Sequence, residues 1–69
     1  MKFKKGFGVV IQEEGPYKNI NGTVINADRY YPYIEVRTIN PRTGAVVDRL
    51  FPEDKLKHFL HDVFCIKGD

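Results

Sequence analysis

Turn-forming residues recur at short intervals along this sequence and divide it into short extended runs. Glycine, proline, asparagine and aspartate cluster at residues 13–16, 28–32 and 40–44. Runs this short suit strands better than helices, so the spacing favours a small antiparallel barrel or sandwich over a helical bundle. We therefore expect four or five strands.

The expected strands cover about 7–12, 22–27, 33–39 and 45–51, and the alternation is clearest in the third. There Ile34, Val36 and Thr38 fall on one side, which should be the core face. The opposite side carries Tyr33, Glu35, Arg37 and Ile39 and should be largely wet. Residues 40–44, with a proline and a glycine, predict the hairpin loop that joins this strand to 45–51.

The C-terminal quarter allows two interpretations. Residues 52–54, Pro-Glu-Asp, suit the first turn of a helix, and apolar residues at 56, 59, 60, 63 and 64 have helical spacing. In the alternative, residues 52–55 form a tight turn, and 56–60 and 63–66 are short strands that close the barrel. The sequence leaves both open.

Length and cysteine content limit how such a chain can be stabilised. Its 69 residues suffice for one domain, 1–69, with one thin core. Cys65 is the single cysteine, so neither an internal disulfide nor a structural zinc site is expected, and no cofactor is indicated. This composition fits a cytoplasmic protein. The lysine-rich start has no long apolar run behind it, so we expect neither export nor membrane insertion.

The segment between the first two expected strands contains the most specific motif. Gly15, Lys18, Gly22 and Val24 match, in register, the pattern Gly-x-x-Lys-Gly, two residues, Gly-x-Val. This segment resembles the KOW motif of ribosomal proteins and transcription elongation factors. Asn19 replaces the family's second glycine, and asparagine is the side chain that best tolerates the left-handed backbone that glycine would provide. The resemblance covers residues 9–25.

Residues 33–36 through 49–56 also resemble the later strands and tight turn of an SH3-like or Tudor-like barrel. The two resemblances together imply a mainly β fold, a single five-stranded SH3-like barrel, with a short C-terminal helix as one alternative. Such barrels bind RNA, DNA, peptides or other domains, so the fold does not give the ligand.

Candidate contact residues are cations that could meet phosphates and aromatic rings that could stack on bases. The KOW resemblance points to Lys18, with Tyr17 and Asn19 beside it. In the competing interpretation Tyr17 packs over the barrel mouth and Lys18 is only solvated. A second cluster lies in the loop after residue 27, where Tyr30 or Tyr31 is the better candidate for exposure. The full set is Lys4, Lys5, Tyr17, Lys18, Asn19, Arg29, Tyr30, Tyr31, Arg37 and Arg42.

No constellation of catalytic residues is evident, so we expect a binding module and not an enzyme. His58 and His61 are three residues apart, but a metal site there is disfavoured. We expect the partner to be RNA or DNA within a transcription or translation complex. The alternative is a protein-interaction module, for example a virus-encoded regulator of a host transcription, translation or nucleoid protein. A third alternative is an edge strand that pairs with its own copy.

Overall fold

The chain forms five strands and one short 3-10 turn in a single sheet. The computed structural model describes residues 3–59. The strands are β1 (Gly8–Ile11), β2 (Asn21–Asn26), β3 (Tyr33–Ile39), β4 (Val46–Pro52) and β5 (Leu56–His58), with the 3-10 turn η1 (Glu53–Lys55) between β4 and β5. This confirms the mainly β, five-stranded fold class expected from the sequence. Residues 3–59 contain no α-helix, and hence no apolar helix that could span a membrane.

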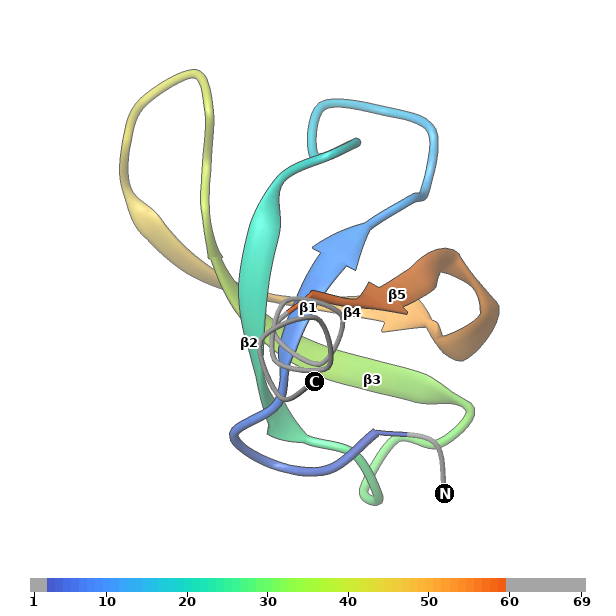
Figure 1. Cartoon of the computed structure of the whole chain (residues 1–69). Helices are drawn as coiled ribbons and strands as arrows, with labels where there is room; N and C mark the ends of the chain where they lie inside the picture. The colour runs from blue at the N-terminus through green and yellow to red at the C-terminus, as the bar shows by residue number, and fades with distance from the viewer. Residues whose placement is uncertain (1–2, 60–69) are drawn as a thin grey trace, which may run out of the picture.

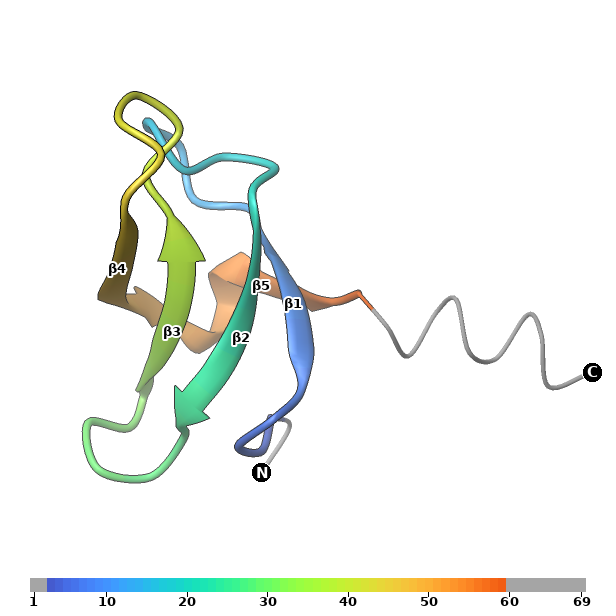
Figure 2. The same cartoon turned by 90° about the vertical axis from the view of Figure 1, so that its left-hand side faces the viewer.

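The sheet is an antiparallel meander whose last strand returns to its first. The strand order is β4-β3-β2-β1-β5, and β5 pairs with β1 so that Val9 faces His58 and Ile11 faces Leu56. The sheet curls into an open, barrel-like shape (Figures 1 and 2). Within the described residues no ladder joins β4 to β5, so these two strands are the free edges of the sheet.

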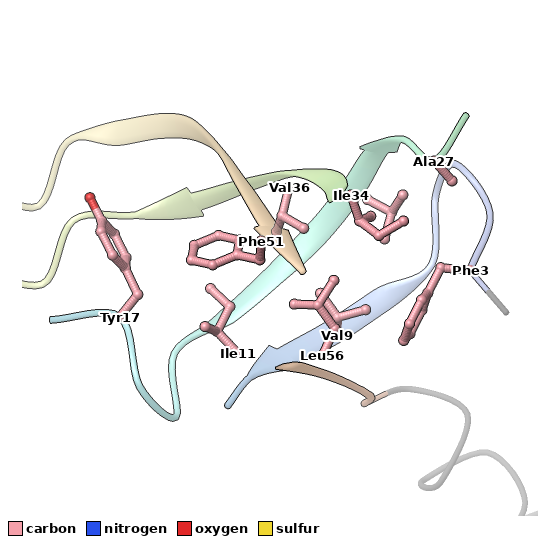
Figure 3. Close-up of a cluster of buried hydrophobic side chains, with 10 residues drawn as sticks. Phe3, Val9, Ile11, Tyr17, Ala27, Ile34, Val36, Phe51 and Leu56 are labelled. Atoms are coloured by element: carbon pink, nitrogen blue, oxygen red, sulfur yellow. The ribbon is translucent and has the colours of Figure 1, made fainter. Parts of the chain in front are cut away.

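The core lies inside this curl and follows the alternation of the strands. Ile34, Val36 and Thr38 are all buried, and the intervening residues of β3 are more exposed, as the sequence predicts. Figure 3 shows the buried side chains gathered between the strands. The apolar core consists of Phe3, Val9, Ile11, Tyr17, Val24, Ala27, Ile34, Val36, Phe51 and Leu56. At its margin the Thr38 hydroxyl donates a 2.7 Å hydrogen bond to the carbonyl oxygen of Asn21, which satisfies this polar group.

Phe3 anchors the segment that precedes β1. Its side chain is 0% exposed, and its ring lies 4.5 Å, centroid to centroid, from the ring of His58. The chain then reverses, and the Gly6 N–H donates a 2.8 Å hydrogen bond to the carbonyl oxygen of Val24. Lys4 and Lys5, two of the candidate contact residues, are exposed beside this anchor.

The segment after β4 decides between the two interpretations of the C-terminal quarter. A helix beginning at Pro52 is wrong, because the backbone of Leu56 is already extended, with φ −122° and ψ 145°. The tight turn is confirmed, and β5 starts directly after it. The Gln12 N–H donates to the Lys55 carbonyl oxygen at 2.7 Å, and the Phe59 N–H donates to that of Gly8 at 3.0 Å. Pairing with β1 thus satisfies backbone groups that a helix would have to satisfy internally. The helix positions beyond 59 and the strand expected at 63–66 lie outside the described residues.

Gly22 is required by close packing between β2 and β3. A Cβ atom at this position would lie 2.5 Å from Cγ1 of Val36 and 3.0 Å from the carbonyl oxygen of Arg37. These separations are too short for any side chain without movement of the neighbouring strand. Gly22, which matches the final glycine of the KOW pattern, is therefore required by the packing of this sheet.

Candidate functional site

The loop between β1 and β2 is held in one conformation by its own hydrogen bonds. The Lys18 N–H donates to the Gly15 carbonyl oxygen at 3.2 Å, and the Asn19 N–H donates to that of Ile11 at 2.7 Å. Asn19 has φ 67°, which is the left-handed conformation expected when asparagine stands for glycine. This backbone expectation is confirmed.

Tyr17 belongs to the core and not to the solvent surface. Its side chain is 7% exposed, and its ring packs edge-on against Phe51 with 6.0 Å between centroids. The interpretation of Tyr17 as a stacking platform for bases is therefore wrong, because little of its ring is open to a ligand. The competing interpretation, in which the ring closes the core at the barrel mouth, describes the structure.

Lys18 is exposed but already has an anionic partner. Its Nζ forms an ion pair with Glu14, four residues earlier in the same loop. The hydrogen bond from Lys18, together with its charge, lowers the pKa of Glu14. A phosphate would have to compete with this carboxylate for Lys18.

The β1–β2 loop and the β3–β4 hairpin loop lie at the same end of the sheet (Figure 2), and residues of both loops line a recess. It has a volume of about 510 Å³ and is lined by Pro16, Tyr17, Asn40, Arg42 and Arg49. We call it the arginine pocket. The guanidinium group of Arg49 lies 5.4 Å from the centroid of the Tyr17 ring. Within residues 3–59 neither Arg42 nor Arg49 forms a salt bridge with a carboxylate, so both charges are available to an anion.

Arg49 is not among the candidate residues predicted from the sequence, although the alternation of side chains along a strand indicates which face it lies on. Arg49 lies opposite Val36 in the β3–β4 register, and Val36 points into the core. Side chains directly opposite each other share one face of a sheet. The side chain of Arg49 therefore lies on the inner face, next to the ring of Tyr17.

The tyrosine-rich loop lies at the other end of the sheet (Figure 2). The side-chain oxygen of Asn26 shapes its start by accepting hydrogen bonds from the backbone N–H groups of Asp28 at 3.2 Å and Arg29 at 3.0 Å. Tyr30 and Tyr31 are both exposed, as expected. The guanidinium group of Arg29 lies 5.6 Å from the centroid of the Tyr30 ring.

One of these rings is tied to the turn after β4. The Tyr31 hydroxyl donates a 3.0 Å hydrogen bond to a carboxylate oxygen of Glu53, and this bond raises the pKa of Tyr31. Lys4 and Lys5 border a neighbouring recess together with residues 25–28. We refer to Lys4, Lys5, Arg29, Tyr30 and Tyr31 as the tyrosine end.

Arg37 stands apart from both ends, on the outer face of β3. Its guanidinium group makes two hydrogen bonds to the carboxylate of Asp48 on β4, at 2.8 and 3.1 Å. These bonds lower the pKa of Asp48. Arg37 is thus already paired, in the fork geometry that it would use for a phosphate.

The ten candidate residues therefore do not form one surface. The end of the sheet that holds the arginine pocket carries Tyr17, Lys18, Asn19 and Arg42. The five residues of the tyrosine end lie at the opposite end, and Arg37 lies between the two groups on the outer face. Within residues 3–59 no group of three or more His, Cys, Asp or Glu side chains could hold a metal ion. His61 and Cys65 are outside this range.

The outer face of the sheet carries a shallow groove of about 430 Å³. Gly8 contributes no side chain to it, and Ile39, Val46 and Phe59 form apolar parts of its wall. The full lining is Gly8, Asn21, Gly22, Thr23, Arg37, Thr38, Ile39, Val46 and Phe59. We call it the outer groove.

Comparison with protein-family models, with curated proteins and with solved structures gives no match for this chain.

Proposed function

We propose that this domain is a non-catalytic module that binds the phosphate backbone of a nucleic acid through the arginine pocket. The observation that carries the proposal is the convergence of Arg42 and Arg49, both without a carboxylate partner within residues 3–59, on one recess. Guanidinium groups bind phosphate oxygens through paired N–H donors, so two of them in one recess suit a phosphodiester.

The position of the pocket supports the same proposal. One of its walls is the β1–β2 loop, which carries the resemblance to the KOW motif, and Asn19 in that loop has the backbone conformation that the motif requires. Lys18, at the tip of the loop, adds a contact if a phosphate displaces Glu14. The module would then act in a cytoplasmic transcription or translation complex.

Salt dependence gives the proposal a quantitative form. Each phosphate contact to a duplex contributes a slope of about −0.9 to the logarithm of affinity against the logarithm of salt concentration, and about −0.7 for a single strand. Two arginine contacts therefore predict a slope of about −2 for a duplex and about −1.5 for a single strand. Binding should be weak, because few charges take part.

The test is fluorescence anisotropy with labelled single-stranded and duplex RNA and DNA over a series of salt concentrations. The double variant Arg42→Gln, Arg49→Gln should lose most of the affinity and flatten the salt slope. A matched control, Arg29→Gln with Lys57→Gln, removes the same charge from exposed sites elsewhere and should change binding little. Equal losses of affinity in both variants would show that only net charge matters and would refute binding through the arginine pocket.

A second candidate function is protein interaction through the tyrosine end. The observation that favours it is the exposure of Tyr30 and Tyr31 together in the loop at this end of the sheet, because aromatic side chains are enriched where protein partners dock. Binding of this kind should depend little on salt and should persist after nuclease treatment of a lysate. Tyr30→Ala combined with Tyr31→Ala should abolish it, whereas the double arginine variant should not.

A further inference from the structure

β4 is a long edge strand that lacks three of the features that protect such edges, although it carries the charged residues Asp48 and Arg49. It has seven residues, whereas the other edge strand, β5, has three. Proteins that stay monomeric commonly place lysine, an internal proline or a bulge on an edge. β4 has no lysine, its register with β3 is unbroken, and its single proline, Pro52, is its last residue. Within residues 3–59 no other strand covers its outer edge.

The β3–β4 hairpin determines which backbone groups of β4 face outward. The Asn40 N–H donates to the Ala45 carbonyl oxygen at 2.8 Å, so these two residues form a hydrogen-bonded pair. Hydrogen-bonded and non-hydrogen-bonded pairs alternate along an antiparallel ladder. With the register Ile39 to Val46 and onward, the N–H and C=O groups of Val46, Asp48 and Leu50 must point away from β3.

The side chains of these three residues form a pattern that can pair with itself. Val46 is 63% exposed and Leu50 is 45% exposed, both on the outer face, and Asp48 stands midway between them. A two-fold axis through Asp48 would place Val46 opposite the partner's Leu50, and Leu50 opposite the partner's Val46. Every outward N–H and C=O group of the three residues would then have a partner.

We infer that the β4 edge is a self-association surface, on which a second copy of this chain docks by antiparallel pairing of the two β4 strands around Asp48. The pairing joins two five-stranded sheets into one. This inference is independent of the proposed nucleic-acid binding.

Charge and shape agree with a second copy as the occupant. The two Asp48 carboxylates would face each other, and like charges at such positions are unfavourable, but each is neutralised by two hydrogen bonds from its own Arg37. The net charge of +2 per chain gives little long-range repulsion. Val46 also lines the outer groove, so the partner's Leu50 would extend the apolar wall of that groove.

Sedimentation equilibrium from micromolar to millimolar protein tests the inference. The wild-type mass should rise from 8.0 kDa toward twice that value. Leu50→Pro should stay at 8.0 kDa, because proline removes an outward N–H without breaking a bond to β3. Leu50→Lys keeps the backbone N–H and should also stay monomeric, which covers the case in which the proline variant fails to fold.

Tyr33→Lys is the matched control, since Tyr33 is similarly exposed on the same face but lies one strand inward. It should associate like the wild type. A wild-type chain that stays at 8.0 kDa at millimolar concentration would overturn the inference and leave the edge to a partner of another kind. Normal association of a folded Leu50→Lys variant would also overturn it.

A cross-linking experiment tests the register. In a Cys65→Ser background, Asp48→Cys should give a covalent dimer with a short bifunctional maleimide, because the symmetric register places both copies of residue 48 side by side. Arg29→Cys, which lies at the far end of the sheet, should cross-link much more slowly. Equal rates for the two variants would refute the symmetric register.

Discussion

Replacement of Phe3 by alanine should remove a large part of the stability of this domain. The side chain is 0% exposed and fills the end of the core beside Ala27 (Figure 3). Phenylalanine-to-alanine changes at fully buried sites cost about 3–5 kcal/mol, because transfer free energy is lost and a cavity remains. A domain of 69 residues has a total stability of roughly 3–10 kcal/mol. The variant should therefore be marginally folded or unfolded at room temperature.

Urea unfolding followed by circular dichroism measures this effect. The neighbouring Phe7 provides the control, because it has the same chemistry but is 39% exposed. Phe7→Ala should cost about 1 kcal/mol or less. A loss below about 1 kcal/mol for Phe3→Ala, or equal losses for the two variants, would refute the assignment of the N-terminal segment to the core.

Three further predictions follow from individual contacts. Gly22→Ala should lower the free energy of unfolding by about 1–3 kcal/mol in urea titrations, because the new methyl group would overlap a valine of β3; an unchanged midpoint would contradict this packing. Arg37 lowers the pKa of Asp48, so the stabilisation from their ion pair is present above the ordinary value of 3.8 and is lost as pH falls through the lowered value. Asp48→Asn should therefore show a smaller acid-induced loss of stability than the wild type, and parallel pH curves would count against the pair. Glu53→Gln should lower the pKa of Tyr31 toward 10.0, measured by ultraviolet titration of the tyrosines, and an unaltered titration would exclude the hydrogen bond.

Strand bounds and side-chain burial are predicted best from the sequence where one face of a strand is buried and the other is exposed to water. The bounds of β3 and the faces of its residues agree with the alternation, because a strand with a single buried face shows a period of two in its hydrophobicity. The backbone of Asn19 was also predictable, since few residue types adopt a positive φ. Both are local properties of the chain.

Features that depend on contacts between distant residues were harder to predict from the sequence. Whether an aromatic residue next to a lysine is buried depends on what packs against it, and Tyr17 meets Phe51 only after the sheet has curled. The burial of Phe3 likewise depends on a distant residue, since its ring packs against that of His58. Ion pairs formed across strands, such as Arg37 with Asp48, likewise change which cations can meet a ligand. The sequence therefore supplied the candidate residues but not their grouping into separate surfaces.

The pairing of the last strand with the first has a consequence for how this protein matures on the ribosome. β1 leaves the exit tunnel before β5, which covers its outer edge and starts only at Leu56. Contacts this distant along the chain form slowly, because a long loop must close first. We expect a nascent chain halted before Leu56 to stay protease-sensitive, with the edge of β1 exposed to chaperones. The native sheet should therefore form only after β5 has left the exit tunnel.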